Sequence, residues 1–587
     1  MDIFSILTLI GGLAMFLYGM DVMGDSLKKL AGGKLEMILS KLTSNRFMGF
    51  LLGFFVTAVI QSSSATTVML VGFVNSGIMK LGQTLGVIMG ANVGTTVTAW
   101  LLSLSGINGS GPIWLKLLKP SSFTPLLIAI GVVMIMMCKS DKKKNIATIL
   151  IGFSVLMFGM DMMSGAMEGL KDSEGFKQLL IAFENPVLAI LVGTLLTAII
   201  QSSSASIGIL QALSLTCFIP HNVALPIILG QNIGTTITPI ISSVTGNTES
   251  KRVATACLYI KILGVVIVYS VFCLLDWKFD FAFMNQDATI VSIATIHTVF
   301  NIISTVVLIP FTKFIEFLTV KTIRSKKVET VSEFGVLDDR FLSIPAFAVE
   351  KCREMVCTMS QKARDAVIDA TSLIENYDKD LVNKIIESEN LIDTYEDKIS
   401  SYLVKIAKSD LGEKDSKTTT ELLQCISDIE RISDYSAIIT ENLSEVDRNH
   451  LKFTSSALFE LKVISSAVNE IIEMTHKAFE DDDLALARNV EPLRQVVDRL
   501  KVKIKTNHVV RLQEGKCSIE MGLILSDLLN NYSRIADHCS NVAVCMLEID
   551  RGSLDAHERL NNEVNSEEDT FFSEKYAMYK AKYSIVK

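Results

Sequence analysis

Two short polar motifs interrupt otherwise apolar stretches of the chain, and their side chains could bind ions. A glutamine followed by three serines occurs twice, with an offset of 140 residues between the copies. Serine hydroxyls and glutamine amides both donate and accept hydrogen bonds, so these side chains can serve an anion or a small cation. The candidate binding residues are Gln61, Ser62, Ser63 and Ser64 in the first copy and Gln201, Ser202, Ser203 and Ser204 in the second.

The backbone around each serine motif could bind ions as well. Residues 46–60 and 65–78 are each too short to span a membrane comfortably, which predicts two half-helices that meet at a re-entrant tip. Serine is a preferred N-cap, so the second half-helix should begin at the serines and offer free N–H groups to an anion. The first half-helix should end at Ile60–Gln61, where free carbonyls suit a cation. Two such tips converging at the midplane would hold an oxyanion with Na⁺ beside it.

A second polar motif repeats at the same offset. The sequence Gly-x-Asn-x-Gly-Thr-Thr begins at Gly90 and again at Gly230. We expect its polar side chains to line the same cavity and to supply cation ligands. The alternative is that its small residues let helices approach closely. The residues concerned are Asn92, Thr95, Thr96, Asn232, Thr235 and Thr236.

The chain joins two halves of different character, although its overall net charge is −8 and its mean hydropathy +0.40. Residues 1–318 are apolar, with windows mostly long enough to cross about 30 Å of hydrocarbon as helices. Residues 328–587 are rich in charged side chains. The ten cysteines show no CxxC spacing, and six of them lie in the charged half, which favours a reducing cytosol for it.

The number of membrane crossings predicts how the duplicated apolar halves are related. Each repeat contains an opening span, a hairpin that crosses twice or not at all, a span carrying the second motif and a closing span. The total is odd, so the second repeat must be inverted relative to the first. The basic loops share one side if the N-terminus is outside, which places the charged half in the cytoplasm. Inverted repeats with matching polar breaks are typical of secondary transporters.

These paired motifs, together with the stretch from His297 to Asn301, resemble the sodium-dependent phosphate cotransporter family (type II) over about residues 1–320. The resemblance implies sodium-coupled phosphate transport by alternating access between the two repeats, with Na⁺ as the co-transported ion. It carries substrate and sodium positions onto the two serine motifs and Thr66, and it adds Asn301 to the cavity.

One stretch departs from that family's pattern. Residues 251–261 resemble the family's RRxAxAHxxFN, but Cys257 stands where histidine is usual and Lys261 where asparagine is usual. An ionisable residue inside a span is a functional candidate. The ammonium of Lys261 either replaces a bound cation or joins the anion site, or alternatively it snorkels to the cytoplasmic edge.

The charged half resembles PhoU, a regulator of phosphate transport, over about residues 340–550, and its internal duplication predicts a pair of three-helix bundles. In that family, acidic pairs four residues apart on neighbouring helices hold metal, either a divalent or an iron-type ion. The matching residues here are Glu389, Asp393, Glu430 and Asp434. A solvated acidic face is the alternative. In the second bundle Arg494 and Ser533 replace acids, so a metal there is doubtful.

The expected fold class is all-α, with a polytopic membrane domain of two inverted repeats followed by cytoplasmic bundles. The expected segments are a first repeat (1–140), a second repeat with an extra span (141–320), a linker (321–340), a PhoU-like domain (341–550) and a polar tail (551–587).

The leading functional expectation is a plasma-membrane symporter of sodium and inorganic phosphate with a regulatory domain. The alternatives are transport of another oxyanion, or a phosphate sensor that signals through the charged half. A serine-dependent enzyme is not expected, because nothing places His221 or His297 as a base for a serine. The expected partners are phosphate, sodium, the lipid bilayer and a cytoplasmic regulatory partner. A homodimer is compatible with this organisation, and nucleic acid is not expected to bind.

Overall fold

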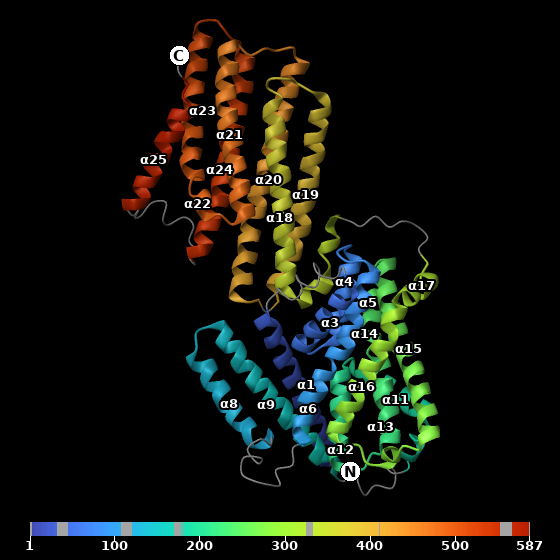
Figure 1. The fold of residues 1–587 in the computed structure, drawn as a ribbon. Coiled ribbons are helices and arrows are strands. Elements are labelled where there is room, and N and C mark those ends of the chain that lie inside the picture. The colour runs from blue at the N-terminus through green and yellow to red at the C-terminus, as the bar shows by residue number, and fades with distance from the viewer. Residues whose placement is uncertain are drawn as a thin grey trace. The chain divides into compact units, whose positions relative to one another are not determined.

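The computed structural model describes residues 3–31, 45–106, 120–168, 178, 180–324, 333–409, 411–551 and 566–585. Every named regular element in these ranges is a helix, which confirms the predicted all-α fold class. The chain divides into two compact units, residues 1–347 and 348–587, whose helices are labelled in Figure 1.

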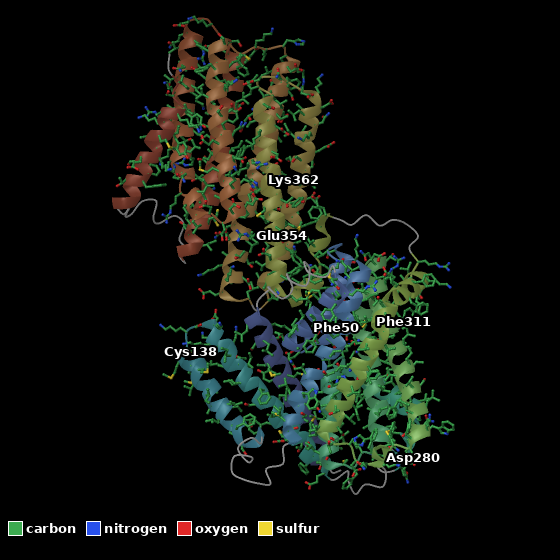
Figure 2. All side chains as sticks on the ribbon, viewed as in Figure 1. Phe50, Cys138, Asp280, Phe311, Glu354 and Lys362 are labelled. Carbon is green, nitrogen blue, oxygen red and sulfur yellow. The ribbon has the colours of Figure 1, made fainter. Side chains whose placement is uncertain are left out.

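The first unit has the composition of a membrane protein on its outside as well as along its helices. Among the described residues, six helical segments are long and apolar enough to cross a membrane. Large apolar side chains such as Leu126, Ile199 and Val266 are exposed on this unit. Figure 2 shows the side chains of both units, with Cys138, Asp280 and Phe311 among those labelled in the first.

The two repeats contain corresponding helices. The first repeat comprises α1 (Ile3–Ala31), α3 (Arg46–Ile60), α4 (Ser63–Asn75), α5 (Leu81–Gly94), α6 (Thr96–Ser103) and α8 (Pro120–Met137). The second comprises α9 (Asp141–Met167), α11 (Pro186–Ile200), α12 (Ser203–Thr216), α13 (His221–Gly234), α14 (Ile237–Ser243) and α15 (Thr248–Phe279). Two further helices follow, α16 (Ile290–Leu308) and α17 (Thr312–Thr322).

The opening helices of the two repeats pack against each other and run antiparallel. A Cβ atom on Gly12 of α1 would lie 3.0 Å from the carbonyl oxygen of Gly159 in α9. One on Gly152 would lie 2.9 Å from the carbonyl oxygen of Gly19. Residue numbers therefore increase along α1 in the direction in which they decrease along α9, so the two helices are antiparallel. Because these helices occupy equivalent positions in the duplication, the repeats are inverted, as their crossing number predicts.

The second arm of each hairpin packs against the other repeat. Helix α4 of the first repeat contacts α14 of the second, and α12 of the second repeat contacts α6 of the first. Each serine motif thus leads into a helix that packs on the other repeat, and transporters built from inverted repeats bind their substrates between the repeats.

The span that carries the second polar motif consists of two helices in each repeat. In the first repeat α5 ends at Gly94 and α6 begins at Thr96, and in the second α13 ends at Gly234 and α14 begins at Ile237. Both threonine pairs therefore lie at a helix break.

Part of the segment expected to be a linker is packed into the first unit. Residues 333–343 form two short 3₁₀ helices, η5 (Glu333–Val336) and η6 (Asp339–Ser343). The amide of Asn75 on α4 donates to Asp338 at 2.8 Å, and the rings of Phe73 and Phe341 lie 5.5 Å apart. The boundary between the units accordingly follows Phe347.

The second unit is a pair of three-helix bundles, as predicted. The first bundle contains α18 (Pro345–Ser372), whose start belongs to the first unit, with α19 (Lys379–Ala407) and α20 (Glu413–Arg448). The second contains α21 (Ser455–Asp481), α23 (Val490–Gln513) and α24 (Ile519–Arg551), with the short α22 (Leu484–Ala487) between them. In the tail, α25 (Ser566–Lys582) packs on α23, and Lys582 pairs with Glu470 at 2.8 Å.

Candidate functional site

The tips of both hairpins adopt the same unusual backbone conformation. Gln61 follows α3 and Gln201 follows α11, and both residues have a φ angle of 59°. Non-glycine residues adopt this left-handed region rarely, and at a cost that clusters at ligand-binding sites. In each copy the chain thereby turns from the end of one half-helix to the start of the next, as the sequence predicts.

In each copy one serine caps a helix, and the two serines after it lie buried or half-buried at the tip with free hydroxyls. Ser62 and Ser202 are the N-caps, and their hydroxyls accept the N–H groups of Ala65 at 3.1 Å and Ala205 at 3.2 Å. The hydroxyls of Ser63, Ser64, Ser203 and Ser204 have no hydrogen-bond partner among the described residues. Together with the free N–H groups of the first helical turn, these hydroxyls can bind an oxyanion.

Unlike those serines, the threonines near the tips have no free hydroxyl proton. Each donates its only proton to a backbone carbonyl three or four residues earlier in the chain. Thr95 donates to Ala91 and Thr235 to Asn232, at 2.9 and 2.6 Å. Thr66, Thr96 and Thr236 do the same with Ser62, Val93 and Ile233. Only oxygen lone pairs remain on these hydroxyls, and lone pairs suit a cation such as Na⁺.

The glycines of the second motif serve close helix packing. A Cβ atom on Gly90 would overlap the carbonyl oxygen of Phe50 on α3, and one on Gly230 would overlap that of Ile190 on α11. The alternative of close helix approach is therefore confirmed for these glycines.

The two hairpin tips differ in their hydrogen bonds. Thr98 on α6 donates to the side-chain oxygen of Gln61 at 2.8 Å, and Gln61 also donates to the carbonyl of Ala58. At the equivalent position in the second repeat, the hydroxyl of Thr238 is buried without a partner and Gln201 is exposed.

The difference continues between the arms of each hairpin. In the first hairpin the hydroxyls of Thr57 and Thr66 lie 3.0 Å apart and form a hydrogen bond. The hydroxyls of their counterparts, Thr197 and Ser206, are both buried without a hydrogen-bond partner among the described residues. Two copies of one motif therefore occupy two hydrogen-bonding states within a single structure.

Lys261 lies inside the first unit and contacts the second polar motif. It is 6% exposed, and its ammonium donates to the side-chain oxygen of Asn232 at 3.2 Å. In this structure the ammonium is therefore directed to the second polar motif, and a role for this lysine at the ion site stays a prediction. On α16, His297 is fully buried with both ring nitrogens unpartnered, and Asn301 donates to its carbonyl at 2.8 Å.

Several polar residues of this region were not singled out from the sequence. Thr98 and Thr238 are part of the duplicated motif, and their register three residues after Thr95 and Thr235 was the available signal. Gln211 on α12 donates to the carbonyls of Ala99 and Ile290, both at 3.1 Å. No local pattern in the sequence predicts that contact, because it joins distant helices.

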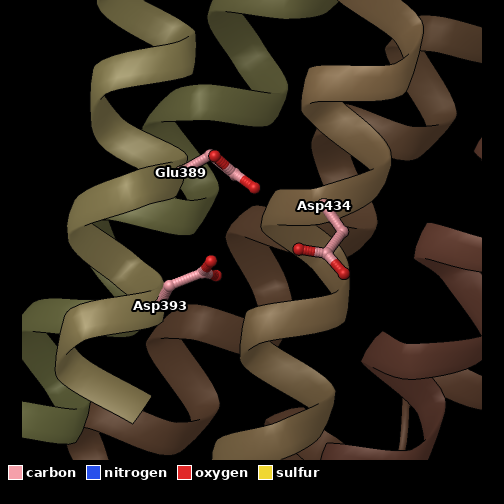
Figure 3. A group of neighbouring side chains, drawn as sticks. All are labelled: Glu389, Asp393 and Asp434. Carbon is pink, nitrogen blue, oxygen red and sulfur yellow. The ribbon is translucent and has the colours of Figure 1, made fainter. Parts of the chain in front are cut away.

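The second unit contains the predicted acidic cluster. Glu389 and Asp393 on α19 face Asp434 on α20, and one ligand oxygen from each lies within 4.8 Å of the others (Figure 3). Partial burial, followed by the charges on Asp393 and Asp434, raises the pKa of Glu389. Carboxylates that share a partly buried space in this way fit a hard divalent cation. Glu430 lies outside this group, next to Arg431 at 3.6 Å.

In the second bundle an arginine occupies the equivalent place. The guanidinium of Arg494 contacts Asp498 at 2.8 Å, Asp537 at 3.2 Å and Glu491 at 2.8 Å, and Ser533 donates to Asp498 at 2.7 Å. An internal cation already balances these carboxylates, which agrees with the expectation that a metal there is doubtful.

Comparison with known proteins covers both units. The family model described as Na+/Pi-cotransporter matches residues 15–165 and 156–284, and the PhoU domain matches residues 356–443 and 461–546. The "Uncharacterized protein YqeW" of Bacillus subtilis is 32% identical over 256 residues, covering 43% of this chain and 78% of that protein.

Two relatives have descriptive names. The "Putative inorganic phosphate export protein YjbB" of Escherichia coli K12 is 23% identical over 554 residues, covering 93% of this chain and 98% of that protein. The "Sodium-dependent phosphate transport protein 2A" of Rattus norvegicus is 35% identical over 99 residues, 16% of this chain and 15% of that protein.

Proposed function

This chain belongs to the Na+/Pi-cotransporter family and carries PhoU domains in its second half, and from this premise we propose that it couples the movement of inorganic phosphate across the plasma membrane to Na⁺. The single observation that carries the proposal is the pair of inverted hairpins whose tips offer unoccupied hydroxyls and helix N-termini. The names of the relatives indicate phosphate as the substrate.

The ion site uses both kinds of hydroxyl near the tips, those of the serines for phosphate and those of the threonines for Na⁺. Phosphate binds to the hydroxyls of Ser63, Ser203 and Ser204 and to the first N–H groups of α4 and α12. Na⁺ binds to the threonine oxygens and to the carbonyl ends of α3 and α11. Co-binding lowers the cost of moving a multiply charged anion through a medium of low dielectric constant. The ammonium of Lys261, next to Asn232, supplies a positive charge to the same site.

Alternating access follows from the difference between the hairpins. In the described state Thr98 holds Gln61 at the first tip, while Thr238 and Gln201 do not pair at the second. Because the repeats share these motifs and are inverted, the opposite-facing state arises when the second tip adopts the bonded arrangement and the first releases it. Exchange of one hydrogen bond for an equivalent one keeps the two states close in free energy.

The proposed orientation places the N-terminus outside and the second unit in the cytoplasm, as the distribution of basic loops predicts. The second unit regulates transport, and its acidic cluster at Glu389, Asp393 and Asp434 binds a divalent metal ion. The chain acts as a transporter and not as an enzyme.

Efflux is the second candidate, favoured by the full-length match to a protein named as a phosphate exporter. Radiolabelled phosphate flux in proteoliposomes separates the candidates. Accumulation driven by an inward Na⁺ gradient, but not by an equal K⁺ gradient, supports the symporter. Sodium-independent loss from phosphate-loaded vesicles supports an exporter, and binding without flux supports a sensor.

A further inference from the structure

A basic cavity lies at one end of the second bundle of the second unit. Its volume is about 280 Å³, and it is enclosed by the loop between α20 and α21 and the loop between α23 and α24. The polar residues that line it include His450, Lys452, His508, Arg511, Lys516 and Ser518. This cavity is far along the chain from the acidic cluster and plays no part in the proposed ion site of the first unit.

Two long helices begin at this cavity. Thr454 caps the start of α21 by accepting the N–H of Ala457 at 3.3 Å, and Ser518 caps the start of α24 by accepting the N–H of Met521 at 3.2 Å. All four residues line the cavity. The positive ends of two helix dipoles and their remaining free N–H groups therefore face the same space, which favours an anion.

Arg511 gives the cavity a preformed binding group. The residue is only 8% exposed, and its Nη1 pairs with Glu460 on α21 at 2.8 Å. Its Nε and Nη2 atoms are buried without a hydrogen-bond partner. These two nitrogens form one edge of the planar guanidinium, and such an edge matches two oxygens of an oxyanion. Unpaired buried donors are costly, so a bound oxyanion would remove a penalty that the unit otherwise carries.

The charges around the cavity add to the same preference. Lys516 pairs with Glu514 at 2.7 Å, and Lys452 lines the cavity from the opposite loop. Burial, and then the charge on Arg511, lowers the pKa of His508, which is the response of a base in a positive surrounding. The carboxylates in contact with the basic side chains are Glu460 and Glu514, so positive groups outnumber them.

We propose that this cavity is a binding site for a phosphate group, either inorganic phosphate or the head of a small phosphate monoester. Its volume lies just below about 300 Å³, the lower end for cavities that bury drug-sized ligands, which excludes large phosphorylated ligands. All its residues belong to the second unit, so the assignment does not depend on the proposed transport function. A phosphate site here would let the regulatory unit respond directly to the concentration of the anion.

Hydrogen–deuterium exchange of the full chain in detergent tests the proposal, because it shows which residues become protected when the anion binds. The buffer contains choline in place of Na⁺, and the added anions are inorganic phosphate, glycerol 2-phosphate and chloride at equal ionic strength. Phosphate or the monoester should slow exchange in residues 450–457 and 508–522. Stronger protection by one of the two assigns the source of the phosphate group. Equal protection by chloride, or none by either phosphate compound, would overturn the proposal.

Substitutions distinguish a specific phosphate site from non-specific attraction of anions to basic side chains. The double variant Lys452→Gln with Lys516→Gln leaves the Arg511–Glu460 pair intact and should weaken the anion affinity at least about tenfold, equivalent to about 1.4 kcal/mol. Arg511→Gln should abolish the protection. If that variant fails to fold, because Glu460 is left buried without its partner, the double variant decides. Lys408→Gln, at an exposed position at the end of α19, is the matched control. If phosphate protects the double variant as strongly as the wild type, the cavity is not the phosphate site.

Discussion

The hydroxyl of Thr98 donates to the side-chain oxygen of Gln61 at 2.8 Å, and this bond closes the tip of the first hairpin. The equivalent residues of the second repeat, Thr238 and Gln201, form no such bond in the part of the chain that the structure describes. One motif therefore occupies two hydrogen-bonding states in one structure, and the alternating-access cycle that we propose exchanges these two states between the hairpins.

Thr98→Ala should open the first tip. A neutral hydrogen bond is worth about 1 kcal/mol net, so its loss should raise the population of the open first tip by about fivefold. Hydrogen–deuterium exchange of the purified protein should then accelerate in residues 58–66. Thr238→Ala is the matched comparison: that hydroxyl is unpartnered in this state and would be bonded only in the opposite-facing one, so its loss should not accelerate exchange at the first tip. Similar acceleration by both variants would contradict the idea of a closed first tip.

Lys261→Asn should change how transport depends on sodium. The substitution removes the fixed positive charge beside Asn232, so the apparent affinity for phosphate should fall and more Na⁺ should be needed to reach half-maximal flux. Flux is measured as a function of Na⁺ concentration in proteoliposomes. Lys278→Asn, at the exposed end of the same helix α15, is the control. An unchanged sodium dependence and substrate preference in Lys261→Asn would remove this lysine from the site.

Gly90→Ala should destabilise the first unit. The added Cβ atom meets the carbonyl oxygen of Phe50, so α3 and α5 must move apart, at a cost of about 1–3 kcal/mol. Thermal unfolding in detergent should show a lower midpoint. Gly165→Ala is the matched control, because a Cβ atom there meets nothing within 4 Å. Its midpoint should stay the same or rise, as helix propensity favours alanine. A midpoint for Gly90→Ala equal to the wild-type value would contradict the close packing.

Metal binding to the first bundle should strengthen as pH rises. Partial burial, and then the charge on Asp393, raises the pKa of both Glu389 and Asp434, two of the three carboxyls in the cluster. Raised values mean that protons compete with the metal on the acid side, so affinity grows as these protons leave. Titration of the purified protein with Mn²⁺ at pH 6 and pH 8 measures the difference.

Substitutions locate that metal. Asp434→Asn should lower the affinity for Mn²⁺ at least about tenfold, because a ligand and a charge are lost. Asp397→Asn, exposed on α19 outside the cluster, should not affect it. Equal affinities at both pH values, or equal effects of the two substitutions, would favour the alternative of a solvated acidic face.

Some features could be predicted from the sequence because local chemistry determines them. The serine N-caps at Ser62 and Ser202, the inverted repeats and the replacement of acids by Arg494 and Ser533 all follow from residue type and spacing. The break at Thr95 was missed because threonine is compatible with a continuous helix. The difference between Thr98 and Thr238 could not be predicted at all. Both copies have the same residues there, so only the conformation of the whole unit distinguishes them.

We propose that both serine tips bind the transported phosphate together with Na⁺. The most direct measurement is uptake of radiolabelled phosphate into proteoliposomes under an inward Na⁺ gradient, comparing Ser63→Ala and Ser203→Ala with wild type. Ser214→Ala is the control, because Ser214 lies on α12 and donates to Gln211 within its own helix. A hydrogen bond to a charged group contributes roughly 1.5–3 kcal/mol, so each tip variant should raise the phosphate concentration for half-maximal uptake at least about tenfold. Uptake by either tip variant that matches the Ser214→Ala control would contradict the claim.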